Sequence, residues 1–277
     1  MLNWWSSTYK EGMNVSSTPL PDSAITTAPL VHLNQVYVSY SRGIRRRAAA
    51  YTERPAGVAN PGLVLAGVEM RVYPGEIYGL LGLNGAGKST LMNAIMGVVS
   101  YSGTIFIAGE PWRPDHLDHI GASINGPAFY PHLNAYRNLL VHARLTGTDP
   151  ARIEEVLTTV GLHAGNKAAR SYSTGMKVRL AMAMALLTDP AILLLDEPTN
   201  GLDPEAIVGL RTVLRNLADS GKAVVVSSHY LGEVAKTADR IGVLTQGQLA
   251  YEGPLAAFAS AGQSLEEAFF TTVGVQP

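Results

Sequence analysis

The sequence predicts a protein of the α/β class, in which helices cover a mainly parallel β-sheet. The chain has 277 residues, of which 47% are hydrophobic and 16% charged, so it can bury a large core. Short apolar runs alternate with helical patterns, an order typical of parallel strands joined by crossover helices. In the second half, Ile192–Asp196, Ala223–Ser227 and Ile241–Leu244 are such runs, and helical patterns separate them.

The first strands are expected near the amino terminus. Val31–Tyr40 and Leu63–Val72 alternate apolar and polar residues, which indicates two strands of a hairpin. The segment of about 42–61 contains Gly, Pro and three successive arginines, so we predict a long exposed loop. Its arginines suit a solvated surface or a contact with phospholipid headgroups or an acidic partner. Residues 1–29 are rich in Ser, Thr and Pro and predict a flexible tail, which leaves 30–277 as a single domain.

Helical patterns dominate the middle of the chain, and we expect an inserted helical subdomain over about 114–188. A later helix is marked by Asp203 as its cap, by proline in its first turn and by an apolar stripe over Pro204–Ala218. The other expected helices are Gly87–Val98, Asn134–Thr146, Ala151–Val160, Thr174–Leu187 and one from Tyr230, and the other expected strands are Glu76–Gly82 and Ser102–Ala108.

Composition excludes several classes of function. The formal net charge of −1 disfavours a dedicated nucleic-acid binder. The chain has no cysteine, which excludes disulfide scaffolds, thiolate metal sites and cysteine nucleophiles. No apolar run approaches the roughly 18 residues of a membrane-spanning helix, and the first residues do not resemble a signal peptide. We therefore expect a soluble, cytosolic chain that reaches a membrane only through a partner.

A phosphate-binding loop is predicted at residues 82–89, which read Gly-Leu-Asn-Gly-Ala-Gly-Lys-Ser and match the G-x-x-x-x-G-K-[ST] pattern. The pattern stands between an apolar strand and a helix, as the chemistry requires. Glycines let backbone N–H groups point at phosphate oxygens, and the following helix adds its positive end. Lys88 supplies an ammonium for the β- and γ-phosphates, and the Ser89 hydroxyl is a ligand for Mg²⁺.

Two adjacent carboxylates, Asp196 and Glu197, end a strongly apolar strand. The carboxyl ends of parallel strands are where open sheets bind ligands, so these acids should meet the phosphate loop. Neighbouring residues of a strand point to opposite sides. We therefore expect one carboxylate to orient Mg²⁺ and the other to face the γ-phosphate and an attacking water.

Three further motifs complete an ordered set: Tyr-Ser-Thr-Gly-Met-Lys at 172–177, Asn-Gly-Leu-Asp at 200–203 and Ser-Ser-His at 227–229. With these, the chain resembles the nucleotide-binding subunits of ABC transporters from about Val31 to Phe270. The resemblance implies a P-loop NTPase fold with a mainly parallel core sheet, an N-terminal antiparallel β subdomain and an inserted α-helical subdomain. It implies ATP and Mg²⁺ as cofactors, and ATP hydrolysis at the cytoplasmic face of the membrane. The implied partners are a separate transmembrane permease and a second ATP-binding subunit, with no nucleic acid.

The resemblance also implies residue roles. Tyr40 matches the aromatic that stacks on adenine, with Tyr37 as a second choice and an ordinary strand aromatic as the alternative. Glu197 matches the general base, and His229 matches the histidine that contacts the γ-phosphate. The implied phosphate cradle is Asn84, Gly85, Ala86, Gly87, Lys88, Ser89 and Thr90. The implied metal contacts are Ser89, Asp196 and Asn125, and the implied contacts with the nucleotide of the opposing subunit are Ser173, Thr174, Gly175 and Asp203.

The chain departs from the family pattern at two positions. Where the family has Gly-Gly followed by Gln, this chain has Thr174, Gly175 and Met176, which keep one hydroxyl donor and one glycine. Where the family places a glutamine that contacts Mg²⁺, this chain has the shorter Asn125, which favours a contact through water. The residues after it, Pro-Ala-Phe-Tyr-Pro, resemble the bacitracin and lantibiotic self-protection branch.

The sequence therefore predicts an ATPase subunit of an exporter of an antibiotic, peptide or other amphipathic compound. A soluble ABC-type ATPase of assembly or remodelling is the alternative. It is disfavoured because zinc cysteines, a coiled-coil insertion and a tandem second ATPase are lacking. A binding module without turnover would lack the base, and Glu197 is present.

Overall fold

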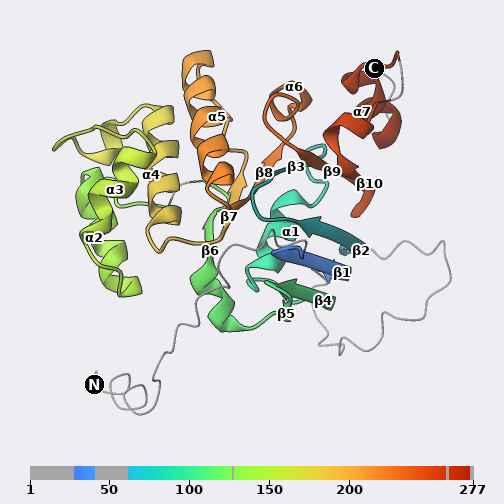
Figure 1. Ribbon diagram of the computed structural model, residues 1–277, viewed down its shortest axis with the longest axis horizontal. Helices are drawn as coiled ribbons and strands as arrows, with labels where there is room; N and C mark the ends of the chain where they lie inside the picture. The colour runs from blue at the N-terminus through green and yellow to red at the C-terminus, as the bar shows by residue number, and fades with distance from the viewer. Residues whose placement is uncertain (1–27, 41–61, 127, 260–261, 275–277) are drawn as a thin grey trace, which may run out of the picture.

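The computed structural model describes residues 28–40, 62–126, 128–259 and 262–274 (Figure 1). The predicted flexible tail, except for its last two residues, and the predicted loop at 42–61 lie outside the described residues.

The core of the molecule is a six-stranded sheet in the order β10-β9-β3-β8-β7-β6. Every neighbouring pair is parallel except β10 with β9. This confirms the predicted α/β class with a mainly parallel sheet. The strands are β3 (Ile77–Leu81), β6 (Ile120–Ser123), β7 (Ile192–Asp196), β8 (Ala223–Ser228), β9 (Arg240–Thr245) and β10 (Gln248–Pro254).

A second, antiparallel sheet has the order β2-β1-β4-β5 and contains the predicted hairpin. Its first strand, β1, buries Val31, Leu33, Val36 and Val38, the apolar side chains that point to its inner face. The strands are β1 (Val31–Ser39), β2 (Leu63–Val72), β4 (Ser102–Ile107) and β5 (Glu110–Pro111).

The two sheets enclose helix α1 (Lys88–Ile95), and α5 (Pro204–Asp219) covers the other face of the core sheet. Strand β7 shows how the sequence builds both layers. Ile192 and Leu194 pack with α1 and the antiparallel sheet, whereas Leu193 and Leu195 pack with α5 on the opposite face. Because successive strand residues alternate in direction, a continuous apolar run is buried on both sides.

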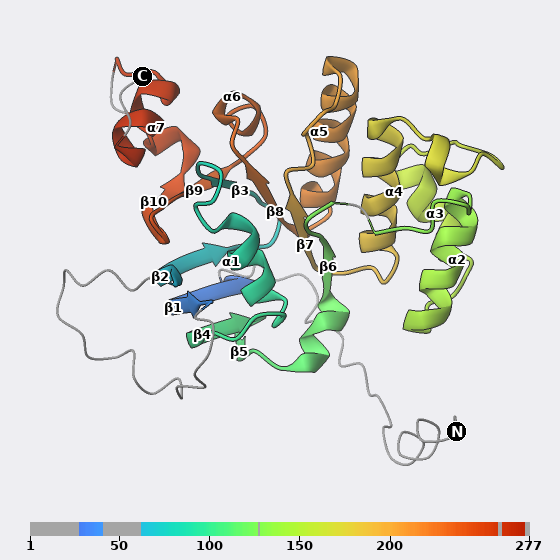
Figure 2. The same ribbon diagram turned by 180° about the vertical axis from the view of Figure 1, so that it is seen from behind.

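Helices α2 (Ala135–Thr146), α3 (Arg152–Thr159) and α4 (Thr174–Leu186) gather at one end of the core sheet, and α7 (Leu265–Val273) lies at the other end (Figures 1 and 2). Asn134 and Ser173 cap α2 and α4 with side-chain oxygens that accept backbone N–H groups. The remaining helical elements are α6 (Leu231–Val234) and the 3₁₀ turns η2 (Pro114–His119), η3 (Ala169–Ser171) and η4 (Leu255–Ala257).

Besides β5 and β10, which were not predicted, three elements differ from expectation. Within the mostly helical range of 114–188, β6 is a strand of the core sheet, paired with β7 from Ile120 to Ser123. Helix α1 ends at Ile95 rather than Val98 because Gly97 adopts a left-handed conformation, with φ of 66°. The helix expected from Tyr230 is a single turn.

Candidate functional site

The phosphate loop connects β3 to α1 at the carboxyl edge of the core sheet. Gly85 and Gly87 have φ of 81° and 109°, conformations that side-chain-bearing residues rarely adopt. Gly87 caps α1 without a side chain, so the first-turn N–H groups of the helix have no side-chain acceptor. A Cβ on Gly85 would meet nothing within 4 Å, so that side of the loop is open. The loop thus has the form of an anion cradle.

Lys88 lies buried at the base of this loop, with 7% of its side chain exposed. Its Nζ donates to the carbonyl oxygen of Gly82 at 2.8 Å and lies 3.2 Å from Oε1 of Glu197. The ammonium is therefore held between the loop and the end of β7, where it can neutralise phosphate oxygens.

Asp196 receives two hydroxyl hydrogen bonds. Ser89 Oγ donates to its Oδ2 at 2.6 Å, and Ser227 Oγ donates to its Oδ1 at 2.5 Å. The first contact brings together a hydroxyl and a carboxylate, the hard oxygen ligands that Mg²⁺ prefers. Within the described residues no cluster of three His, Asp or Glu side chains has the arrangement of a metal site, so Mg²⁺ would need phosphate oxygens and water as further ligands.

Glu197 has a different set of partners from Asp196. Its Oε1 faces Lys88, and its Oε2 lies 2.7 Å from Nδ1 of His229. Its backbone is left-handed, with φ of 51°, and its N–H donates to Ser227 Oγ at 2.9 Å. The turn directs the carboxylate toward the phosphate loop rather than along the strand.

Sheet topology brings these residues together. Strands β3, β8 and β7 are adjacent and parallel, so Leu81 pairs with Ser228, and Ser227 pairs with Asp196. Phosphate loop, carboxylates and His229 therefore meet at one edge, and the sequence predicted this meeting for the loop and the carboxylates.

Ser173, Thr174, Gly175 and Asp203 form a second group on the surface. Ser173 caps α4, and Asp203 caps α5 through a 2.8 Å bond from the N–H of Ala206. A Cβ on Gly175 would lie 3.4 Å from that of Ala206, so the two helix starts are neighbours. Ser173, Thr174 and Asp203 are exposed, so this group is accessible on the surface of the chain.

Tyr40 and Asn125 lie apart from these contacts. Tyr40 is 54% exposed at the end of β1, where its N–H donates to the carbonyl oxygen of Gly62. That end of the sheet adjoins the phosphate loop, because a Cβ on Gly87 would touch Leu65. Asn125 is exposed beyond β6, with φ of 60°.

Sequence reasoning missed the part played by Ser227. Its hydroxyl joins both acids, since it donates to Asp196 and accepts from the N–H of Glu197. The available signal was a serine at the end of an apolar strand, beside the motif that contains His229.

Together the fold and the loop at 82–89 define a nucleotide-binding protein with a P-loop NTPase fold. Comparison with known proteins identifies the family. Residues 65–200 match the family described as ABC transporter. The lantibiotic transport ATP-binding protein SrtF of Streptococcus pyogenes is 38% identical over 208 residues, which cover 74% of this chain and 89% of SrtF. The chain belongs to the ABC transporter ATP-binding subunits, and it is an ATP-hydrolysing subunit.

Other relatives agree with this assignment. The bacitracin transport ATP-binding protein BcrA of Bacillus licheniformis is 41% identical over 194 residues, which span 68% of this chain and 63% of BcrA. A solved ATP-binding subunit of an ABC transporter superimposes with a TM-score of 0.72 at 25% identity, covering 88% of this chain and 99% of that one. The dimeric structure of MJ0796, a bacterial ABC transporter cassette, gives 0.68 at 25% identity, with 81% and 98% covered.

In the described part of the chain, no helix combines the length and apolar character needed to span a bilayer.

Proposed function

We propose that the residues around the phosphate loop form the ATPase site, and that the chain powers an exporter through a separate membrane permease. The observation that carries this proposal is the chain of contacts from Lys88 through Glu197 to His229, beside the Ser89–Asp196 pair. It places a cation, a candidate base and a metal-ligand pair at one sheet edge.

Each group has a distinct task in hydrolysis. Backbone N–H groups of Asn84 to Thr90 bind the phosphates, and Lys88 neutralises charge that develops on them. Glu197 orients a water and accepts its proton, and His229 holds the Glu197 carboxylate in place. Tyr40 provides an exposed ring on which adenine can stack.

Ser89 and Asp196 are the residues that would hold Mg²⁺, because their oxygens lie 2.6 Å apart at the loop. When bound, Mg²⁺ supplies charge neutralisation at the phosphates. Asn125, exposed beyond the neighbouring strand β6, would contact the metal through a water.

The working unit is proposed to be a dimer around two nucleotides. The surface group of Ser173, Thr174, Gly175 and Asp203 offers two adjacent helix starts, whose positive ends suit the phosphates of an opposing subunit. The dimeric structure reported for MJ0796 supports this arrangement by likeness.

A groove between the core sheet and α2 and α4 is the proposed docking site for the permease. Its volume is about 710 Å³, and its lining includes Ile124, Gly126, His142 and Leu145. Leu145 is 77% exposed, so an apolar segment of a partner would bury it. The groove includes the two neighbours of Asn125. Docking of a partner there would therefore change the position of Asn125, which is proposed to contact the metal through a water. The chain would thus lie at the cytoplasmic face of the membrane, held by the permease.

The proposed cargo is an antibiotic, a peptide or another amphipathic compound. The support comes from relatives, since SrtF is a lantibiotic transport protein and BcrA is a bacitracin transport protein.

The test is the substitution Glu197→Gln, which removes the base and keeps the shape. We expect ATP turnover by the purified chain to fall by roughly a hundredfold or more, because general-base catalysis contributes that much. ATP affinity should persist, and ATP should hold the variant as a dimer in size-exclusion chromatography. Phosphate release and nucleotide binding are measured on the same preparation.

The matched control is Glu154→Gln, an exposed acid in the first turn of α3, which should retain full turnover. Undiminished phosphate release by Glu197→Gln would remove Glu197 from the base role.

A further inference from the structure

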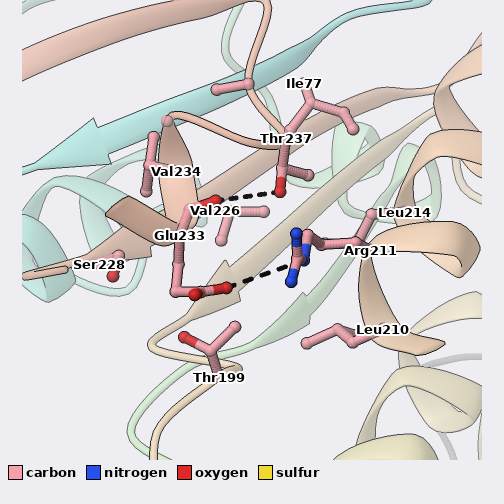
Figure 3. A pocket seen from close by; sticks show the side chains of 12 residues that line it. Ile77, Thr199, Leu210, Arg211, Leu214, Val226, Ser228, Glu233, Val234 and Thr237 are labelled. Carbon is pink, nitrogen blue, oxygen red and sulfur yellow. Dashed lines mark hydrogen bonds and ion pairs between the residues drawn. The ribbon is translucent and has the colours of Figure 1, made fainter. Parts of the chain in front are cut away.

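A small cavity lies under α6, between the core sheet and α5 (Figure 3). Leu210 and Leu214 of α5 and Val226 of β8 form part of its apolar wall. The space in it that is open to the centre of a water molecule is about 20 Å³. That volume admits about one water.

Three polar atoms of the cavity lining are buried and have no hydrogen-bond partner among the described residues: Thr199 Oγ1, Arg211 Nε and Glu233 Oε2. The guanidinium and the carboxylate face each other across the cavity, with Thr199 beside them (Figure 3). Arg211 Nε lies 3.7 Å from Glu233 Oε2, too far for a hydrogen bond but close enough for one water to contact both. Buried polar groups are nearly always paired, so three in one water-sized cavity point to a shared internal water.

The same three residues join the two segments that carry the candidate catalytic pair. Thr199 lies two residues after Glu197, in a turn closed by a bond from the N–H of Asn200 to the Glu197 carbonyl oxygen. Glu233 lies four residues after His229. Glu197 and His229 bond to each other at 2.7 Å, so the two segments meet at the sheet edge and again at the cavity.

We propose that Thr199, Arg211 and Glu233 are positioning residues, linked by one internal water, that fix the segment of Glu197 relative to that of His229. Arg211 gives the link a rigid anchor because it belongs to the 16-residue helix α5. The three residues act only through the orientation of the carboxylate and the imidazole. The inference rests on the proposed roles of Glu197 and His229.

A purely structural role for the cavity has different consequences. If the Arg211–Glu233 pair only held α6 against α5, its loss would lower the melting temperature and leave the kcat of the folded protein unchanged. A positioning role lowers kcat while ATP binding persists, because the phosphate cradle lies on other elements.

The test is Thr199→Val in the full chain, which removes the hydroxyl and keeps the shape. We expect kcat for ATP to fall about tenfold, below the roughly hundredfold cost of a 1 Å misplacement, with an unchanged KM. Thr199→Ser keeps a hydroxyl and should retain kcat. Thr212→Val, on the exposed face of α5, is the matched control and should have no effect.

A double-mutant cycle tests whether the groups act as one unit. Combined with Glu233→Gln, Thr199→Val should cost much less than the product of the two single effects, because either change breaks the same link. Melting temperatures identify any variant that fails to fold. A high-resolution crystal structure provides a second measurement, which should show a water bonded to Thr199 Oγ1, Arg211 Nε and Glu233 Oε2.

An unchanged kcat for Thr199→Val, fully multiplicative effects in the cycle, or a cavity without that water would overturn the inference. If Glu197→Gln abolishes turnover and Thr199→Val does not lower kcat, only the positioning role fails. If Glu197→Gln retains turnover, the proposed function itself fails.

Discussion

Glu76 shows, at the scale of one residue, what burial does to a charge. Its side chain is 12% exposed at the start of β3, and burial raises the pKa of its carboxyl from 4.5 to about 7. The N–H of Tyr73, which donates to it at 2.8 Å, and Arg240, at 3.8 Å, oppose that rise. Neither compensates fully for the lost hydration.

The raised pKa of Glu76 predicts a stability that depends on pH. Between pH 4.5 and about 7 the unfolded chain loses this proton while the folded chain keeps it, so stability falls as pH rises. Above about pH 7 the carboxyl is ionised in both states, and the folded chain bears the full free-energy cost of burying that charge. At pH 8 the Glu76→Gln variant should therefore need more urea to unfold, because its free energy of unfolding should be about 1–3 kcal/mol higher than that of the parent. Near pH 4.5 the two free energies should be equal. Glu266→Gln, an exposed acid of α7, serves as control, and an equal gain at both pH values would contradict the assignment.

Sequence alone predicted most residues of the candidate site but not how they are held. Lys88, Ser89 and Asp196 are recognisable because polar groups interrupt apolar runs at a fixed spacing. The left-handed turn at Glu197 and the double role of Ser227 could not be predicted. Both depend on which strands become neighbours, and a local pattern does not contain that information.

Among the elements, β6 is the one whose formation depends most on its surroundings. Its four residues, Ile-Gly-Ala-Ser, are too few for a periodic signal, and pairing with β7 makes them a strand. Gly121 lies so close to α4 that an added Cβ would stand 2.1 Å from the backbone oxygen of Ala185. The strand and the helical region therefore fit together only with glycine at this position.

Gly121→Ala should accordingly destabilise the protein by roughly 1–3 kcal/mol, since the clash is with backbone and cannot be relieved by rotating a side chain. Urea unfolding of the purified chain measures this loss. Gly232→Ala is the control, because a Cβ at Gly232 would meet nothing within 4 Å and helix propensity favours alanine. Equal stability of the two variants would mean that the contact is looser than described.

Strand β10 carried a signal that sequence reasoning overlooked. Gln246 and Gly247 both adopt left-handed conformations, with φ of 49° and 78°, and connect Thr245 to Gln248 across a two-residue turn. Two successive residues with positive φ are characteristic of the type I′ turn, which joins the strands of tight hairpins. The glycine at 247, between two apolar runs, was the signal available in the sequence. By contrast, nothing local marked β6, so a long-range pairing was needed to find it.

On the scale of the whole molecule, the proposed docking groove lies where the edge strand β6 of the core sheet meets helices α2 and α4. Its lining draws on β6, α2 and α4, so a partner in it would contact both regions at once. Movement of the helices relative to the sheet would then be passed to the partner.

Leu145→Glu should uncouple the assembled transporter. We expect the isolated chain to keep its basal ATP turnover, because Leu145 lies on α2, away from the phosphate loop. Transport and the stimulation of turnover by the permease should fall at least severalfold, because a charge would be buried in an apolar contact. Val98→Glu changes a valine that is 70% exposed outside the groove and should remain coupled. If both variants lost transport and stimulation equally, the effect of Leu145→Glu would not be specific to the groove, and the assignment of the groove as the docking site would fail.

The left-handed backbone at Glu197 is a conformation that costs a residue with a side chain about 1–2 kcal/mol, whereas glycine adopts it freely. A glycine at 197 would remove that cost, but it would also remove the carboxylate that pairs with the buried Lys88 ammonium and bonds to His229. Breaking a buried ion pair costs about 3–5 kcal/mol, more than glycine would gain, so selection for heat resistance alone would keep the carboxylate that the proposed ATPase site needs.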